Sequence, residues 1–177
     1  MEQDMNFNAH LSVLSAIIIG FAIVKLLQGI LWMIQGRLKV YWVHLAWVVI
    51  TILTGINIYW RIGLMPDVRV AEGFVVLTDI LLVPLLLYII ASLLFPRSGK
   101  DGPVDLKEFY YKNRAWIFGT WMVALLPAVA WEVIRLHASW LYFGMLMLGG
   151  LAVTRNQLVH IVVMILMLLG MFAIFLT

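Results

Sequence analysis

Three ionisable side chains stand inside long apolar stretches of the sequence, where their types and positions suggest chemistry. They are Lys25, His44 and Asp79. A charged group at the centre of a membrane span costs about 2.5 kcal/mol or more, so such residues usually pair or line a path for ions or protons. The leading hypothesis is therefore a protein of transport or channel type, whose polar core of Lys25, His44 and Asp79 handles ions or protons.

The second apolar stretch carries a polar stripe that extends this core. The stripe consists of His44, Trp47, Thr51, Thr54 and Asn57, which recur at helical spacing. Lipid cannot satisfy polar groups, so the stripe is expected to face protein or water, with Ile50 and Ile52 on another face. Ordinary hydrogen bonds between helices are the alternative explanation for the threonines.

Lys25 has a polar neighbour one turn along its helix, Gln28, which joins the expected core. Lys25 and Asp79 are expected on opposite sides of the membrane midplane, about 10 Å apart along its normal at a rise of 1.5 Å per residue. Either a structural ion pair or a pair that carries ions or protons is consistent with this spacing.

The four histidines suggest an alternative function, a haem b-binding electron-transfer anchor. His44 and His160 lie about one turn inside one end of their apolar stretches, and His10 and His137 lie near the other surface. Two histidine pairs at two depths are typical of dihaem bundles. Otherwise no cofactor is expected. No motif for a metal site is present, and the absence of cysteine excludes thiolate ligands.

The composition indicates a membrane protein. Hydrophobic residues make up 64% of the 177 residues and charged residues 12%, with a mean hydropathy of +1.04. Soluble domains carry about 25% charged residues. This argues against a soluble enzyme, a nucleic-acid-binding domain and a disordered chain, and an enzymatic role is not favoured. The expected partners are the lipid bilayer and either further copies of the chain or a larger membrane complex. A non-catalytic accessory or scaffold subunit is the third functional hypothesis.

The apolar stretches predict an all-α polytopic bundle in a single domain, residues 1–177. Six spans are favoured, because a span needs roughly 20 residues. A fifth stretch that is short leaves five spans possible. The expected spans are residues 10–34, 40–59, 70–95, 114–134, 139–153 and 157–177. A short interfacial helix is expected at 104–113, with Asp105 as its N-cap and Glu108 in the capping-box position.

Lys and Arg residues predict the orientation, since they favour the cytoplasmic side of a membrane. The connections between spans one and two, three and four, and five and six hold most of them. Both termini are therefore expected on the outer, periplasmic side.

Local segments resemble an uncharacterised family of small bacterial polytopic inner-membrane proteins. The resemblance rests on His44-Leu45-Ala46-Trp47 at the start of a span, Trp60-Arg61 at its end, Pro96, and the run from Asp105-Leu106 to Asn113-Arg114. It implies location in the inner membrane of a bacterium and carries no assigned function.

Overall fold

The protein is a bundle of α-helices. The computed structural model describes the backbone of residues 2–64, 78–96, 103–134 and 140–176, and the side chains of a narrower set. The described residues form six α-helices: α1 (Glu2–Ile34), α2 (Trp42–Leu64), α4 (Val83–Leu93), α5 (Leu106–Ile134), α6 (Trp140–Val153) and α7 (Gln157–Leu176). A π-helical turn, η2 (Thr78–Leu82), leads into α4. The all-α prediction is confirmed. Helix ends coincide with the expected ends at residues 34, 134 and 153, whereas α1 and α5 begin eight residues before the expected starts, and the start expected at residue 70 lies outside the described residues.

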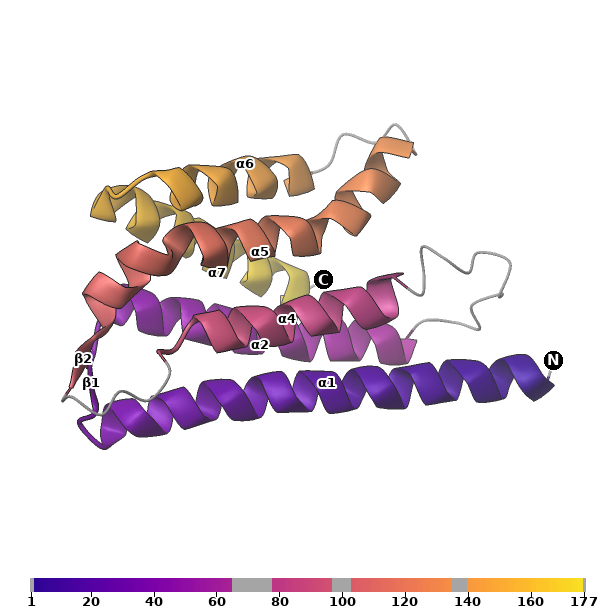
Figure 1. The fold of residues 1–177 in the computed structure, drawn as a ribbon. Coiled ribbons are helices and arrows are strands. Elements are labelled where there is room, and N and C mark those ends of the chain that lie inside the picture. The colour runs from indigo at the N-terminus through magenta and orange to yellow at the C-terminus, as the bar shows by residue number, and fades with distance from the viewer. Residues whose placement is uncertain (1, 65–77, 97–102, 135–139, 177) are drawn as a thin grey trace.

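The helices lie side by side, with α1 at one edge and α6 at the other (Figure 1). α2 is the central element, in contact with α1, α4, α5 and α7. One end of the bundle is closed by two short strands, β1 (Leu38–Lys39) and β2 (Val104–Asp105), which pair in parallel. α1 and α4 end at this end of the bundle, while α2 and α5 begin there (Figure 1). We call it the strand end.

Two of the helices are long and apolar enough to cross a membrane, among the residues whose side chains are described. They are His10–Ile34 and Trp42–Trp60. Three shorter apolar helices are Ile80–Leu93, Tyr142–Val153 and Gln157–Gly170. α6 is the shortest of the late helices: its 14 residues span about 21 Å at 1.5 Å per residue.

α1 packs on the bundle through a narrow seam. Its buried residues follow one another at alternating spacings of four and three: Ser15, Ile19, Ala22, Leu26, Gly29 and Met33. This is the heptad pattern that keeps one stripe of a helix against its neighbours. The opposite side is equally apolar but exposed, at Ile17, Phe21 and Val24 among others. α1 is thus largely apolar on both sides and buried on one stripe only.

Two contacts fix how α1 lies against α4. The Ser15 hydroxyl donates a hydrogen bond to the Ile80 carbonyl. Proline has no N–H, so Pro84 cannot bond the carbonyl four residues before it, which is Ile80. Ser15 therefore supplies a donor to a carbonyl that Pro84 cannot bond. Fourteen residues further along α1, the ring of Phe95 occupies the space where Gly29 lacks a side chain. Both contacts have nearly the same sequence offset, so α1 and α4 run parallel.

Replacing Ser15 with alanine is expected to destabilise the fold by about 1–2 kcal/mol, because the buried Ile80 carbonyl then loses the hydrogen bond from the Ser15 hydroxyl. Ser12→Ala, at a less buried position on the same helix, is the control. The free energy of unfolding in mixed detergent micelles measures both. Equal stability of the two variants contradicts the assigned role of Ser15.

The prediction of a separate interfacial helix at 104–113 is wrong. α5 continues without a break from Leu106 to Ile134. Asn113 and Arg114 do not interrupt it, because their side chains donate to the carbonyls of Phe109 and Tyr111 in the same helix. The predicted N-cap is confirmed: Asp105 Oδ1 accepts the backbone N–H groups of Lys107 at 2.8 Å and Glu108 at 3.3 Å.

Candidate functional site

The strand end holds a cluster of aromatic rings around two buried histidines, which we call the aromatic–histidine cluster. It consists of Tyr41, His44, Trp47, Phe95, Tyr110, Tyr111, Phe118 and His160. Tyr110 is fully buried, and its ring packs against those of five cluster members. Edge-on and tilted ring pairs of this kind add about 0.5–1.5 kcal/mol each beyond the area that they bury. The cluster therefore joins α2, α4, α5 and α7 at one point.

Tyr110 and His160 form a hydrogen-bonded chain. The Tyr110 hydroxyl lies 2.7 Å from His160 Nδ1, and His160 Nε2 lies 3.1 Å from the Thr154 carbonyl. A carbonyl only accepts, so Nε2 carries the proton and donates. In the neutral imidazole, Nδ1 then accepts from the Tyr110 hydroxyl. Both nitrogens of this fully buried ring are satisfied.

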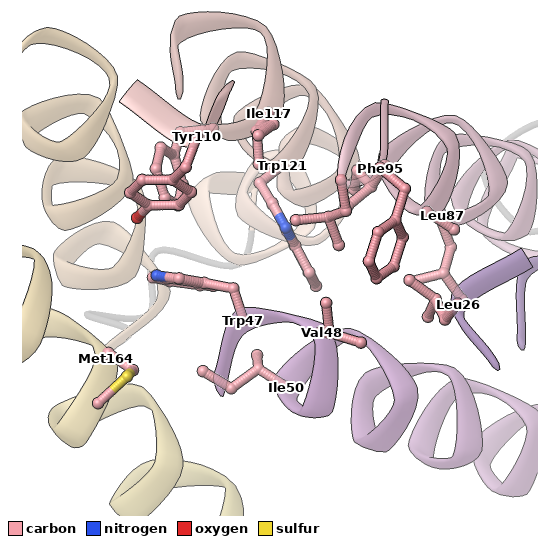
Figure 2. Packing of buried hydrophobic residues seen from close by; sticks show 14 of the residues in the cluster. Leu26, Trp47, Val48, Ile50, Leu87, Phe95, Tyr110, Ile117, Trp121 and Met164 are labelled. Atoms are coloured by element: carbon pink, nitrogen blue, oxygen red, sulfur yellow. The ribbon is translucent and has the colours of Figure 1, made fainter. Parts of the chain in front are cut away.

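His44 is equally buried but is bonded differently. Its ring stands edge-on to Phe95 and Tyr110, with centroids 5.6 and 5.8 Å away. Neither ring nitrogen forms a hydrogen bond to the described residues. The backbone of Leu94 lies near the ring, at the end of α4 where helix carbonyls lack partners within the helix. The Trp47 indole N–H also has no hydrogen-bond partner among the described residues, and it points toward the Tyr110 hydroxyl (Figure 2).

Tyrosine hydroxyls and a lysine cover the cluster on its outer side. The hydroxyls of Tyr41 and Tyr111 lie 3.1 Å apart, and Lys107 Nζ lies 5.9 Å from the centre of the Tyr41 ring. Tyr41, just before α2, is buried. Burial raises the pKa of Tyr110, which precedes the span expected to begin at residue 114. Tyr110 is therefore a neutral hydroxyl donor at physiological pH.

The turn between α6 and α7 positions His160. Asn156 caps α7 by accepting the Leu158 N–H at 3.0 Å, and the Thr154 hydroxyl accepts the Asn156 N–H at 3.1 Å. Arg114 of α5 donates to the carbonyl of Val153, the last residue of α6, at 3.1 Å. A cation at a helix C-terminus is favourable because it faces the negative end of the helix dipole. These bonds fix the position of the Thr154 carbonyl, which accepts a hydrogen bond from His160 Nε2.

The polar stripe of α2 faces protein at its strand-end half. His44, Trp47 and Thr51 are buried, while Thr54 and Asn57 are partly buried. The threonine hydroxyls are used within the helix: Thr51 donates to the Trp47 carbonyl at 2.7 Å and Thr54 to the Ile50 carbonyl at 2.8 Å. They offer no free donor to an ion path. Ile50, which was expected on another face, is also buried at 3% exposed, because α2 is packed on several sides.

Lys25 and Gln28 lie away from His44. They line an open groove of about 330 Å³ together with Phe21, Val24 and Tyr88, on the outer side of α1 and α4. Gln28 is exposed and Lys25 is partly buried. The two polar groups are therefore on the surface of the bundle, whereas His44 is in its interior.

Asp79 lies in the π-helical turn, and its side chain falls outside the described residues. The neighbouring Ile80 is level with Ser15, so the Asp79 backbone is level with Leu14. Lys25 is eleven residues further along α1, about 16 Å at 1.5 Å per residue. This separation along the helix is larger than expected from the sequence and does not favour a direct ion pair.

The donor set does not fit a haem held between His44 and His160. Both His160 nitrogens are already in hydrogen bonds, and Tyr110 packs against both imidazole rings. His10 is exposed on α1, and His137 lies outside the described residues. No group of three or more potential metal ligands occurs among the residues that were described.

The rings of His44 and His160 both contact Tyr110, so the two histidines lie near one another at the strand end. Sequence reasoning missed Tyr110 itself, together with Tyr41, Phe95 and Phe118. The Phe109-Tyr110-Tyr111 run was the available signal, because three successive aromatic residues on one helix cannot all face an aqueous interface.

Comparisons of the chain with protein-family models, with curated proteins and with solved structures find no match. The resemblance to small bacterial inner-membrane proteins therefore remains a prediction.

Proposed function

We propose that this chain is a multi-pass integral membrane protein that serves as a non-catalytic accessory subunit of a membrane assembly. The observation that carries the membrane location is the exposure of its long apolar helices. In the most apolar 18-residue segment of α1, only 28% of the residues are buried inside the bundle. In the corresponding segment of α2, the share is 39%. In water, exposed apolar surface costs about 25 cal/mol per Å². A lipid environment removes that cost.

The distribution of basic residues supports a bacterial inner membrane with the strand end in the cytoplasm. Arg37 and Lys39 follow α1 at this end, Lys107 and Lys112 begin α5, and Arg155 lies between α6 and α7. Cytoplasmic connections are enriched in such residues. With six crossings, both termini are on the periplasmic side.

The accessory role is supported by where the polar groups lie. Lys25 and Gln28 line an outer groove, Thr51 and Thr54 bond their own helix, and His44 lies among aromatic rings. These groups do not form one continuous polar path. A scaffold that displays polar groups on its surface needs no such path, whereas a transporter does.

One observation favours a second candidate, the handling of ions or protons. His44 is fully buried, and its two ring nitrogens make no hydrogen bond to the described residues. An unsatisfied buried polar group in a native structure requires an explanation, and a functional role is one of them. In this alternative, His44 is the exchanging group, and Tyr110 and His160 connect it to the turn between α6 and α7.

Reconstitution of the purified chain into vesicles distinguishes the two functions. The accessory role predicts proton and cation flux no faster than in protein-free vesicles, over a range of pH. His44→Phe preserves the edge-on aromatic packing and serves as the matched variant. Flux above background that His44→Phe abolishes contradicts the accessory role and supports the second candidate.

A further inference from the structure

We propose that the outer groove between α1 and α4 binds a transmembrane helix of a different protein, and that this helix carries a carboxylate at the depth of Lys25. The proposal rests on the membrane location argued above and names the partner class of the accessory role. The groove is lined by Phe21, Val24, Lys25, Gln28 and Tyr88. Phe21 and Val24 are each 62% exposed, so the described residues do not cover this face.

Lys25 lies deep enough in the expected span that its charge requires a polar or charged partner. It lies nine residues before Ile34, the end of α1, which is about 13 Å at 1.5 Å per residue. A lysine near a helix end reaches the headgroups by extending its side chain, but this position is too deep for simple snorkelling. A charged side chain in hydrocarbon pairs with another charge or with polar groups. A carboxylate beside Lys25 supplies that pairing.

By their positions in the sequence, the acidic residues of this chain do not provide a carboxylate at the depth of Lys25. Eight of the nine acidic residues lie outside the expected spans or within two residues of their ends. The ninth, Asp79, is level with Leu14, about 16 Å from Lys25 along α1. A second copy does not change this, because copies inserted with the same orientation place equivalent residues at equal depths. Two copies that met through this groove would oppose Lys25 to Lys25.

The rest of the groove suits a helix with one acidic residue. Gln28 lies three residues after Lys25, on the same face of α1, and Tyr88 contributes a hydroxyl from α4. Both can donate to a carboxylate oxygen alongside the ammonium group of Lys25. Phe21 and Val24 offer apolar surface to the flanking turns of the incoming helix. The charge of Lys25 thus favours a partner with a carboxylate, and the apolar side chains of Phe21 and Val24 pack against the rest of that helix.

The test uses a defined probe, a synthetic leucine–alanine transmembrane peptide with a single Glu at the depth of Lys25. The full chain is labelled at Arg155→Cys, in an exposed turn of a chain that has no other cysteine, and reconstituted in phosphatidylcholine vesicles. Energy transfer to the labelled peptide reports association. We expect the Glu peptide to bind at least about tenfold more tightly than the same peptide with Gln, a difference of about 1.4 kcal/mol.

Three variants locate the effect. Lys25→Met keeps a long apolar side chain and is expected to abolish the preference for Glu, whereas Lys25→Arg is expected to retain it. Lys112→Met removes an exposed charge outside the apolar stretches and is expected to leave the preference unchanged. Thermal unfolding shows that each variant is folded.

Several results overturn the proposal while leaving the membrane location intact. They are equal binding of the two peptides, a preference that survives in Lys25→Met, and loss of the preference in vesicles that contain phosphatidylglycerol, which assigns Lys25 to lipid phosphate. Energy transfer between two copies without peptide, abolished by Lys25→Met, assigns the groove to self-association instead. Failure of the protein to remain in the vesicles contradicts the proposed function itself.

Discussion

Tyr110→Ala is expected to destabilise the folded protein by about 3–5 kcal/mol, the usual cost of removing a large buried aromatic side chain. The Tyr110 ring is fully buried and contacts Tyr41, His44, Tyr111, Phe118 and His160. Its loss leaves a cavity where four helices meet. The free energy of unfolding in mixed micelles is the measurement.

Tyr110→Phe separates the hydroxyl from the ring. The ring contacts remain, but His160 Nδ1 loses its donor while it stays buried, which costs about 1–3 kcal/mol. Tyr59→Phe, at an exposed position of α2, is the control and should change stability by less than about 0.5 kcal/mol. If Tyr110→Phe is as stable as the Tyr59 control, the Tyr110–His160 bond does not support the fold.

Gly29→Ala is expected to cost about 3 kcal/mol, near the upper end for overpacking of a buried site. The added Cβ overlaps the ring atoms of Phe95. The ring cannot move aside freely, because Phe95 is 4% exposed and stands edge-on to His44. The substitution therefore separates α1 from α4 or displaces the aromatic–histidine cluster.

Gly20→Ala provides a matched control on the same helix. Nothing lies within 4 Å of a Cβ at Gly20, so alanine there is expected to stabilise α1 by up to about 1 kcal/mol. Phe95→Leu is expected to recover part of the stability lost in Gly29→Ala, which a double-mutant cycle measures as coupling between the two sites. Equal stability of Gly29→Ala and Gly20→Ala contradicts the close contact.

The positions of the helices were predictable because each apolar run is about long enough to cross a membrane and ends at polar or turn-forming residues. The expected ends at residues 34, 134 and 153 coincide with those of α1, α5 and α6. The small parallel strand pair was not predicted, because each strand has two residues and its partner lies far along the chain. The π-helical turn also carries no periodic signal of its own.

The candidate site was predictable only in part, because its contacts join distant segments. The depths of His44 and His160 in their stretches indicated that they share a level. The aromatic run at Phe109-Tyr110-Tyr111 indicated a buried ring, but not that Tyr110 bonds His160, fifty residues away. The sequence pattern could have predicted that Lys25 lies outside the buried stripe of α1. The heptad seam of Ser15, Ala22 and Gly29 leaves Lys25 outside it, and the small side chains in that seam are a sign of close helix packing.

Accessibility of single cysteines tests the membrane fold most directly, because the natural chain has none. In intact cells, a membrane-impermeant maleimide is expected to label His10→Cys at once, and Gln35→Cys and Arg155→Cys only after the cells are opened. Val24→Cys and Leu146→Cys, both exposed on the bundle, are expected to stay unlabelled until detergent is added, because lipid covers them. Labelling of Val24→Cys and Leu146→Cys as rapid as that of Arg155→Cys in opened cells contradicts a membrane-embedded bundle.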